Sequence, residues 1–262
     1  MRYLRIMWVL IKNSWIRDAK IGGYQIGVFA YRVLEITVTL VFFQIIFSNI
    51  ESLAGWTYYE ILFLYAFSKI VIDLGSTLFK VGVRSISENL VRTGELDFFL
   101  LRPVNTMFLI SFSKPRVLDS INCIFSVAIG YYALIAGNIA IKSENIIWFL
   151  FLALFGVVIY YFLSVLVITP AFWVVKLWSI KYVMNRLGQL MQYPAGILPG
   201  AIRMIFFTAF PILAVSYIPV RVLFWGPKLE YVVYMIVITL ILGIVTRAIW
   251  KLGERSYASA SS

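Results

Sequence analysis

The chain contains no histidine at any of its 262 positions, and it contains a single cysteine, Cys123. Without histidine it cannot build a histidine-ligated metal or haem site, a Ser-His or Cys-His nucleophile pair, or a histidine proton relay. One cysteine cannot form an internal disulfide or a Cys-x-x-Cys site. Cys123 lies in an apolar run, so we expect it to be a small filler facing the core or the lipid.

Charge is also scarce. Charged residues make up 13% of the chain, against about 25% in an ordinary soluble domain. Apolar residues make up 62%, and the mean hydropathy is +0.91. These values exclude a soluble enzyme, a coiled coil and a disordered chain. They predict an all-α polytopic membrane protein, with room for roughly six spans of about 20 residues each.

Nucleotide-binding motifs are absent as well. The sequence has neither the Walker A pattern G-x-x-x-x-G-K-[ST] nor a Gly-rich dinucleotide loop. We therefore predict no enzymatic activity, cofactor or metal on this chain, and any ATP-driven work must be done by another chain. The net charge of +11 is not gathered in a soluble basic patch with interleaved aromatics, so we expect no nucleic-acid binding.

Apolar runs predict six transmembrane helices. They cover residues 26–50, 56–79, 117–136, 146–175, 182–198 and 231–250. Pro170 is expected to kink or end the fourth helix. Ahead of the spans, residues 1–22 form an amphipathic segment, with Trp8 and Trp15 on its apolar face, which predicts a helix in the cytoplasmic interface. Residues 23–262 then form the six-span domain.

The positive charges are unevenly placed around these spans. Of the 23 Lys and Arg residues, 17 fall in the segments assigned to the cytoplasm and four in those assigned to the outside. Cytoplasmic loops of membrane proteins carry such an excess. The distribution predicts that both termini are cytoplasmic and that the number of spans is even.

Four of the charges inside the first two predicted spans form two couples. Arg32 and Glu35 are three residues apart, and Lys69 and Asp73 are four apart, so each couple can pair along its own helix. Charges in a span are costly and mark either a polar pathway or ion pairs that fix helix packing. The helical spacing of both couples favours packing.

Two segments break the pattern of plain spans. Residues 80–103 form the longest polar stretch between spans and mix charges with apolar residues, as a docking surface would; a short helix over 85–91, ended by Gly94, is expected there. Residues 182–225 contain four prolines, too many for one helix. A fifth span to about residue 198, followed by a broken re-entrant segment over 200–225, fits better.

At these two segments the sequence resembles the permease subunits of ABC-2-type exporters. The matching motifs are Gly94-Glu95-Leu96-Asp97-x-x-Leu100-Leu101-Arg102-Pro103-Val104, Tyr193-Pro194, Ile197-Leu198-Pro199, Phe210-Pro211, Ile218-Pro219 and Trp250-x-x-Gly253-x-x-x-Tyr257-x-Ser259-Ala260-Ser261. The resemblance covers nearly the whole chain, and the order of the motifs on a six-span frame is more specific than any one of them.

The resemblance implies a permease in a bacterial plasma membrane that works with a second permease, identical or related, and with two ATP-binding subunits that carry ATP and Mg. Residues 80–103 would be the coupling segment that docks on the ATPase, and residues 1–22 the connecting helix. The implied coupling residues are Glu88, Arg92, Gly94, Glu95, Leu96, Asp97, Leu101, Arg102 and Pro103. The implied residues of the external gate are Pro199, Gly200, Arg203, Pro211 and Pro219.

An alternative function is a secondary transporter or channel that works alone. It would need paired half-repeats or a charged pathway; no internal repeat is visible, and the charges gather near span ends. An intramembrane enzyme would need deep catalytic groups, which the sequence lacks. The substrate is left open, because related permeases handle lipids, drugs, peptides and polysaccharides.

Overall fold

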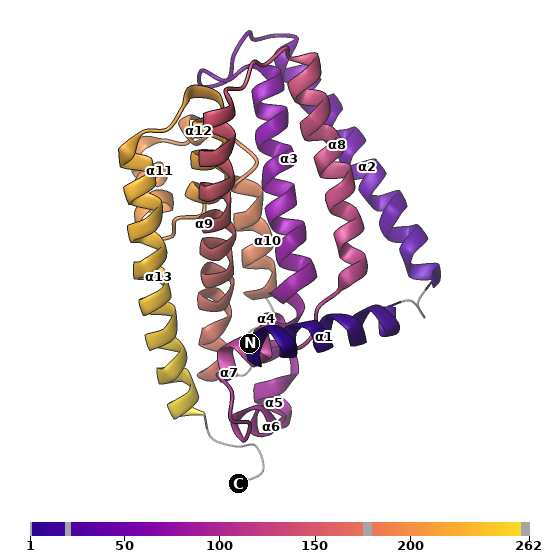
Figure 1. The fold of residues 1–262 in the computed structure, drawn as a ribbon, viewed down its shortest axis with the longest axis vertical. Coiled ribbons are helices and arrows are strands. Elements are labelled where there is room, and N and C mark those ends of the chain that lie inside the picture. Colours follow the sequence, from indigo (N-terminus) through magenta and orange to yellow (C-terminus); the bar gives the residue numbers. More distant parts are fainter. Residues whose placement is uncertain (1, 19–21, 175–179, 258–262) are drawn as a thin grey trace.

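The computed structural model describes residues 2–18, 22–174 and 180–257. Throughout these ranges the regular structure is helical and no strand is present, which confirms the predicted all-α class. Long helices form an upright bundle, with α1 lying across its lower end (Figure 1).

The bounds of the helices follow in chain order. They are α1 (Arg2–Asp18), α2 (Gly22–Phe47), α3 (Tyr58–Gly75), η1 (Ser76–Lys80), α4 (Val81–Ser85), η2 (Ile86–Leu90), α5 (Val91–Thr93), α6 (Leu96–Leu100), α7 (Thr106–Ser111), η3 (Val117–Ser120), α8 (Ile121–Ala136), α9 (Ser143–Ile168), η4 (Thr169–Phe172), α10 (Ile180–Leu190), η5 (Ala195–Ile197), α11 (Gly200–Thr208), α12 (Ala214–Trp225) and α13 (Leu229–Ser256).

Five helical segments of the described chain are long and apolar enough to cross a membrane. They are Gly27–Phe47, Tyr58–Thr93, Val117–Ala136, Ser143–Phe172 and Leu229–Ser256. They correspond to the first, second, third, fourth and sixth predicted spans, and the third has the predicted bounds. Pro170 lies in the 3-10 turn η4 directly after α9, where the sequence predicted an end.

The second span runs further than the sequence predicted. Instead of stopping near Phe79, one helix continues to Thr93, with two π-helical turns, η1 and η2, along its course. The charges at Lys80, Arg84 and Glu88 are four residues apart and share one face, while Ile86 and Leu90 are fully buried on another. Because the apolar face of this continuation is buried and its charged residues lie on another face, the polar residues do not end the helix.

The fifth predicted span is not a single long helix. The described part of that region holds α10, whose 11 residues rise only about 16 Å, then a turn, η5, and two further short helices, α11 and α12. Figure 1 shows α9 ending at the lower end of the bundle and α13 beginning at the upper end, so these pieces together return the chain. The prolines that separate them explain why no long helix forms.

The core is built around α3. Its residues Ile61, Leu62 and Leu64 are fully buried, whereas α2 exposes much of its apolar surface, including Leu34 and Val38. Helices α9 and α12 approach closely at Gly156, where an added Cβ would lie 2.5 Å from the carbonyl oxygen of Val215. The bundle is therefore tight around α3, α9 and α12 and open along α2.

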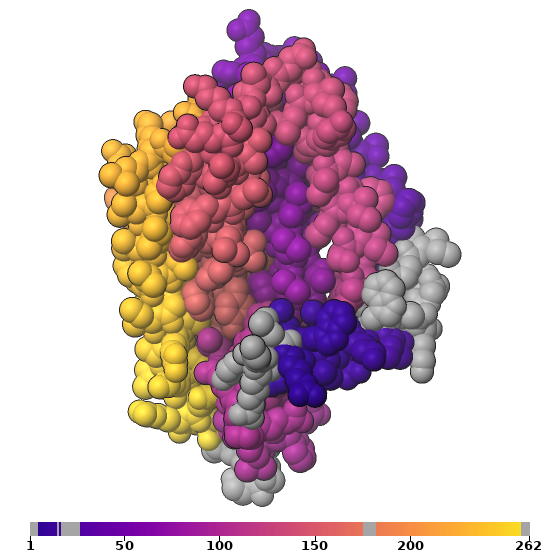
Figure 2. Space-filling model, in the orientation of Figure 1, coloured from indigo at the N-terminus to yellow at the C-terminus, as the bar shows by residue number. Residues whose placement is uncertain are grey.

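Helix α1 packs on the start of the third span. The Ser14 hydroxyl donates a hydrogen bond to the carbonyl of Pro115, and Figure 2 shows α1 lying over the lower part of the bundle. Residues 19–21 at the end of the predicted interfacial helix, Lys176 of the predicted cytoplasmic turn and the Ser259-Ala260-Ser261 motif lie outside the described residues.

Candidate functional site

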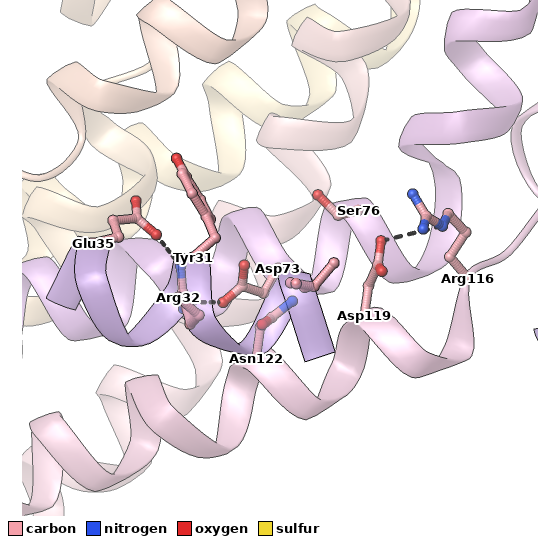
Figure 3. Close-up of a pocket in the computed structure, with 10 residues that line it drawn as sticks. Tyr31, Arg32, Glu35, Asp73, Ser76, Arg116, Asp119 and Asn122 are labelled. Carbon is pink, nitrogen blue, oxygen red and sulfur yellow. Dashed lines mark hydrogen bonds and ion pairs between the residues drawn. The ribbon is translucent and has the colours of Figure 1, made fainter. Parts of the chain in front are cut away.

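Four charged residues of the first two spans form one group, here called the charged cluster: Arg32 and Glu35 of α2 with Lys69 and Asp73 of α3. Arg32 Nη1 lies 2.9 Å from Glu35 Oε2, and Arg32 Nη2 lies 2.6 Å from Asp73 Oδ2. Lys69 Nζ forms an ion pair with Glu35 Oε1. Figure 3 shows the pairs of Arg32 with Glu35 and with Asp73. Arg32, Lys69 and Asp73 are buried, so the ion pairs compensate these charges for their lost hydration.

The pairing differs from the sequence prediction in one respect. Arg32 pairs with Glu35 along α2, as expected, but Lys69 pairs with Glu35 rather than with Asp73, and Asp73 pairs with Arg32. Ser126 of α8 adds a hydroxyl that accepts from Arg32 Nη2 at 2.8 Å. Because α2 and α8 pack on the polar face of α3, Lys69 and Asp73 each pair with a residue of α2 and not with one another. The sequence did not predict a role for Ser126, because its partner Arg32 is distant in the chain.

Two cavities flank the charged cluster. The first, of about 610 Å³, lies between α2, η1, η3 and α8, and Figure 3 shows several of its side chains pointing toward one another. Its ionic lining is Arg32, Glu35, Asp73, Arg116 and Asp119. The second, of about 690 Å³, lies between α2, α3, α9 and α10. Tyr31 and Glu35 line both, so the cluster forms part of the wall between them.

The predicted coupling segment, residues 80–103, contains the end of the long helix that runs from α3 through α5, and a sharp turn follows that helix. Gly94 follows α5 with φ of +77°, a left-handed conformation that favours glycine. The chain then forms the short helix α6, at the lower tip of the molecule in Figure 1. Phe98 and Leu101 are 69% and 82% exposed there. Large apolar side chains so exposed at a tip are typical of a docking surface.

The other predicted coupling residues differ in burial. Arg92, Glu95, Arg102 and Pro103 are exposed, and Glu88 and Asp97 are partly buried, with Glu88 Oε1 lying 3.1 Å from Arg84 Nε. Leu96 is fully buried, so it anchors α6 to the body and cannot be a contact for a partner. The sequence could not separate Leu96 from Leu101, because both are leucines within one short apolar run.

The coupling segment is joined to the bundle by a close backbone contact. An added Cβ at Gly82 would lie 2.3 Å from the carbonyl oxygens of Ile110 and Ser111 in α7. Asn105 caps α7, its Oδ1 accepting from the Phe108 amide at 2.9 Å. These contacts hold the chain on both sides of α6.

The predicted gate residues lie in and between the short helices of the re-entrant segment. Pro199 precedes α11, Gly200 begins it and Arg203 is exposed upon it. Pro211 is buried in the turn before α12, and Pro219 is buried inside α12. Pro199, Gly200, Pro211 and Pro219 thus lie where the backbone changes direction or loses a helical hydrogen bond, whereas Arg203 lies within α11, where its amide donates to the carbonyl of Pro199.

An arginine in an aromatic setting lies near the end of α12. The Arg221 guanidinium carbon is 5.9, 5.4 and 5.7 Å from the ring centres of Tyr217, Trp225 and Tyr231. Arg221 Nη1 also donates to Tyr217 Oη at 3.1 Å. The i, i+4 spacing of Tyr217, Arg221 and Trp225 is the signal in the sequence that indicates this contact, whereas Tyr231 comes from the next helix.

A family model described as ABC-2 family transporter protein matches residues 33–261. The match covers most of the chain, and the protein belongs to this family. It is the membrane permease part of an ABC transporter, and this family is a transport component that is not itself catalytic. Membership implies, in general terms, association with ABC ATP-binding subunits. No curated protein matches the chain closely enough to add a relative.

Proposed function

We propose that this chain is the permease subunit of an ATP-driven exporter. It would form the translocation pathway with a second permease, identical or related, and would couple to two ATP-binding subunits that hold ATP and Mg. The expected location is the bacterial plasma membrane, with both termini in the cytoplasm. The observation that carries the proposal is the exposed apolar tip at Phe98 and Leu101, in and after the short helix α6, which follows the second span directly after the turn at Gly94.

The mechanism follows from that connection. Closure of the ATP-binding subunits would push on α6, and the helix from Tyr58 to Thr93 would carry the displacement into the bundle core. The re-entrant segment, residues 200–225, would then open the external exit, since irregular backbone at membrane depth normally lines a cavity.

The test is co-purification of the affinity-tagged chain with an ATP-binding protein encoded beside it. Leu101→Asp is expected to weaken the association at least tenfold, because it places a charge in an apolar contact, a change worth about 1–3 kcal/mol or more. Leu229→Asp is the matched control: Leu229 is 78% exposed but lies at the opposite end of the bundle.

Equal recovery of the ATP-binding protein with Leu101→Asp and with the wild type would contradict the docking assignment. Transport by the purified chain alone in vesicles without ATP would instead establish the alternative, an independent secondary carrier.

A further inference from the structure

The second cavity beside the charged cluster has an unbalanced charge. Its ionic lining consists of three cations, Lys69, Lys80 and Arg186, and one carboxylate, Glu35. Glu35 is already shared between Lys69 and Arg32. The residues that line the cavity therefore carry a net positive charge.

Lys80 is the clearest source of this excess. It sits in η1, is partly buried, and has no ion pair or hydrogen bond with any residue that the structure describes. A cation withdrawn from water without a partner is costly, and a membrane interior offers it little solvent. An anion bound in the cavity would remove that cost.

Helix α10 supplies the neutral groups of the same wall. Asn185, Gln189 and Gln192 line the cavity, spaced so that α10 and the turn after it present their amides together. Arg186 Nη1 contacts Gln189 Oε1 at 3.4 Å. Amide N–H groups beside lysine and arginine are donors suited to the oxygens of a phosphate or similar anion.

The first cavity provides an internal comparison. Its lining includes three carboxylates, Glu35, Asp73 and Asp119, against the two arginines Arg32 and Arg116. Both arginines are engaged in ion pairs there. An anion would meet net repulsion in that cavity, so the preference for negative charge is confined to the one beside α10.

The border of the second cavity also bears on the ligand. Tyr31 of α2 lines it and is 66% exposed, and α2 carries exposed apolar residues, among them Leu34 and Val38, along its outer surface. An apolar tail could follow this helix in the membrane while its polar head occupied the cavity.

We propose that the cavity between α2, α3, α9 and α10 binds the phosphate-type anionic headgroup of an amphipathic molecule, with Lys80 and Arg186 as its main charged contacts. This inference deepens the proposed export function and rests on it for the further statement that the amphiphile is a transported substrate.

The experiment uses the purified full chain in detergent micelles. Native mass spectrometry measures the binding of dioleoyl phosphatidylglycerol and of zwitterionic dioleoyl phosphatidylcholine, and inorganic phosphate is tested as a competitor and as a ligand by itself. We expect the anionic lipid to bind more tightly. Lys80→Gln and Arg186→Gln should each weaken it about tenfold, whereas Lys80→Arg should retain it. Lys251→Gln, which removes an exposed lysine outside the cavity, is the matched control.

Each outcome has a defined meaning. Direct binding of inorganic phosphate that depends on Lys80, without binding of the lipid, supports the anion site and assigns its anion to a soluble source. Equal binding of both lipids, or unchanged binding in Lys80→Gln and Arg186→Gln, overturns the proposal. Since this readout needs no ATP-binding subunit, its failure is separate from a failure of the co-purification test.

Discussion

Arg32 connects three helices through a single side chain. It contacts Glu35 on its own helix α2, Asp73 on α3 and Ser126 on α8. The charges of Arg32 and Asp73 are nearly removed from solvent, so each depends on the other. These contacts favour the packing role for the charged cluster over a polar pathway.

Arg32→Gln is expected to destabilise the chain by about 3–5 kcal/mol, because it leaves the buried Asp73 carboxylate without its cation. Thermal unfolding in detergent, followed by tryptophan fluorescence, measures this as a lower Tm. The double variant Arg32→Gln with Asp73→Asn should recover part of the loss, since it removes both charges.

Lys142→Gln is the control for the loss of one positive charge, because Lys142 is exposed before α9. A Tm for Arg32→Gln equal to that of this control would show that the charged cluster does not hold the helices together.

Among the helices, the one from Tyr58 to Thr93 connects the buried core of the bundle to the tip formed by α6. Its upper part is buried among α8, α9 and α12, and its lower part ends at the coupling segment. Where it passes α7, the two backbones are so close at Gly82 that no side chain would fit between them. This contact fixes the position of α6 relative to the bundle.

Gly82→Ala should therefore act more strongly than an alanine in a helix ordinarily does. The new methyl group would meet two backbone carbonyls, which cannot rotate away, so α4 and α7 must separate at a cost of about 1–3 kcal/mol. A lower Tm and weaker recovery of the ATP-binding protein are the expected results.

Gly130→Ala in α8 is the matched variant, since its added Cβ would have its nearest neighbour at 3.5 Å, an ordinary contact. If both alanine variants behaved like the wild type, the close approach at Gly82 would have no role in positioning the coupling segment.

At the scale of the whole molecule, α1 and the end of α13 lie at the same end of the bundle, together with the coupling segment (Figure 1). The loop between α2 and α3 lies at the opposite end. This arrangement agrees with the excess of Lys and Arg assigned to the cytoplasm, and it makes the sidedness of the protein testable.

In a Cys123→Ser background, single cysteines at Ser52 and at Ser256 should react differently with a membrane-impermeant maleimide. We expect the Ser52→Cys variant to be labelled in intact cells and the Ser256→Cys variant only after permeabilisation, because the loop and the end of α13 lie at opposite ends. Labelling of both in intact cells would contradict the predicted orientation.

Much of the fold could be predicted from the sequence because the bilayer imposes a simple length rule. Five of the six predicted spans have counterparts, and the third matches at both ends. The errors lie where polarity alone was taken to end a helix, as after Phe79, and where prolines divide the fifth span. At the site, Leu96 and Leu101 could not be told apart, because burial depends on which way α6 faces the bundle.

Composition, run length and missing residue types are enough to predict an all-helical membrane protein without histidine chemistry or a nucleotide-binding motif, because these properties do not depend on how the chain folds. Only the tertiary structure decided that Lys69 pairs with Glu35, that Leu96 is internal and that Lys80 faces a cavity without a partner. Each of these depends on residues distant in the chain, since pairing and burial arise when helices pack against one another.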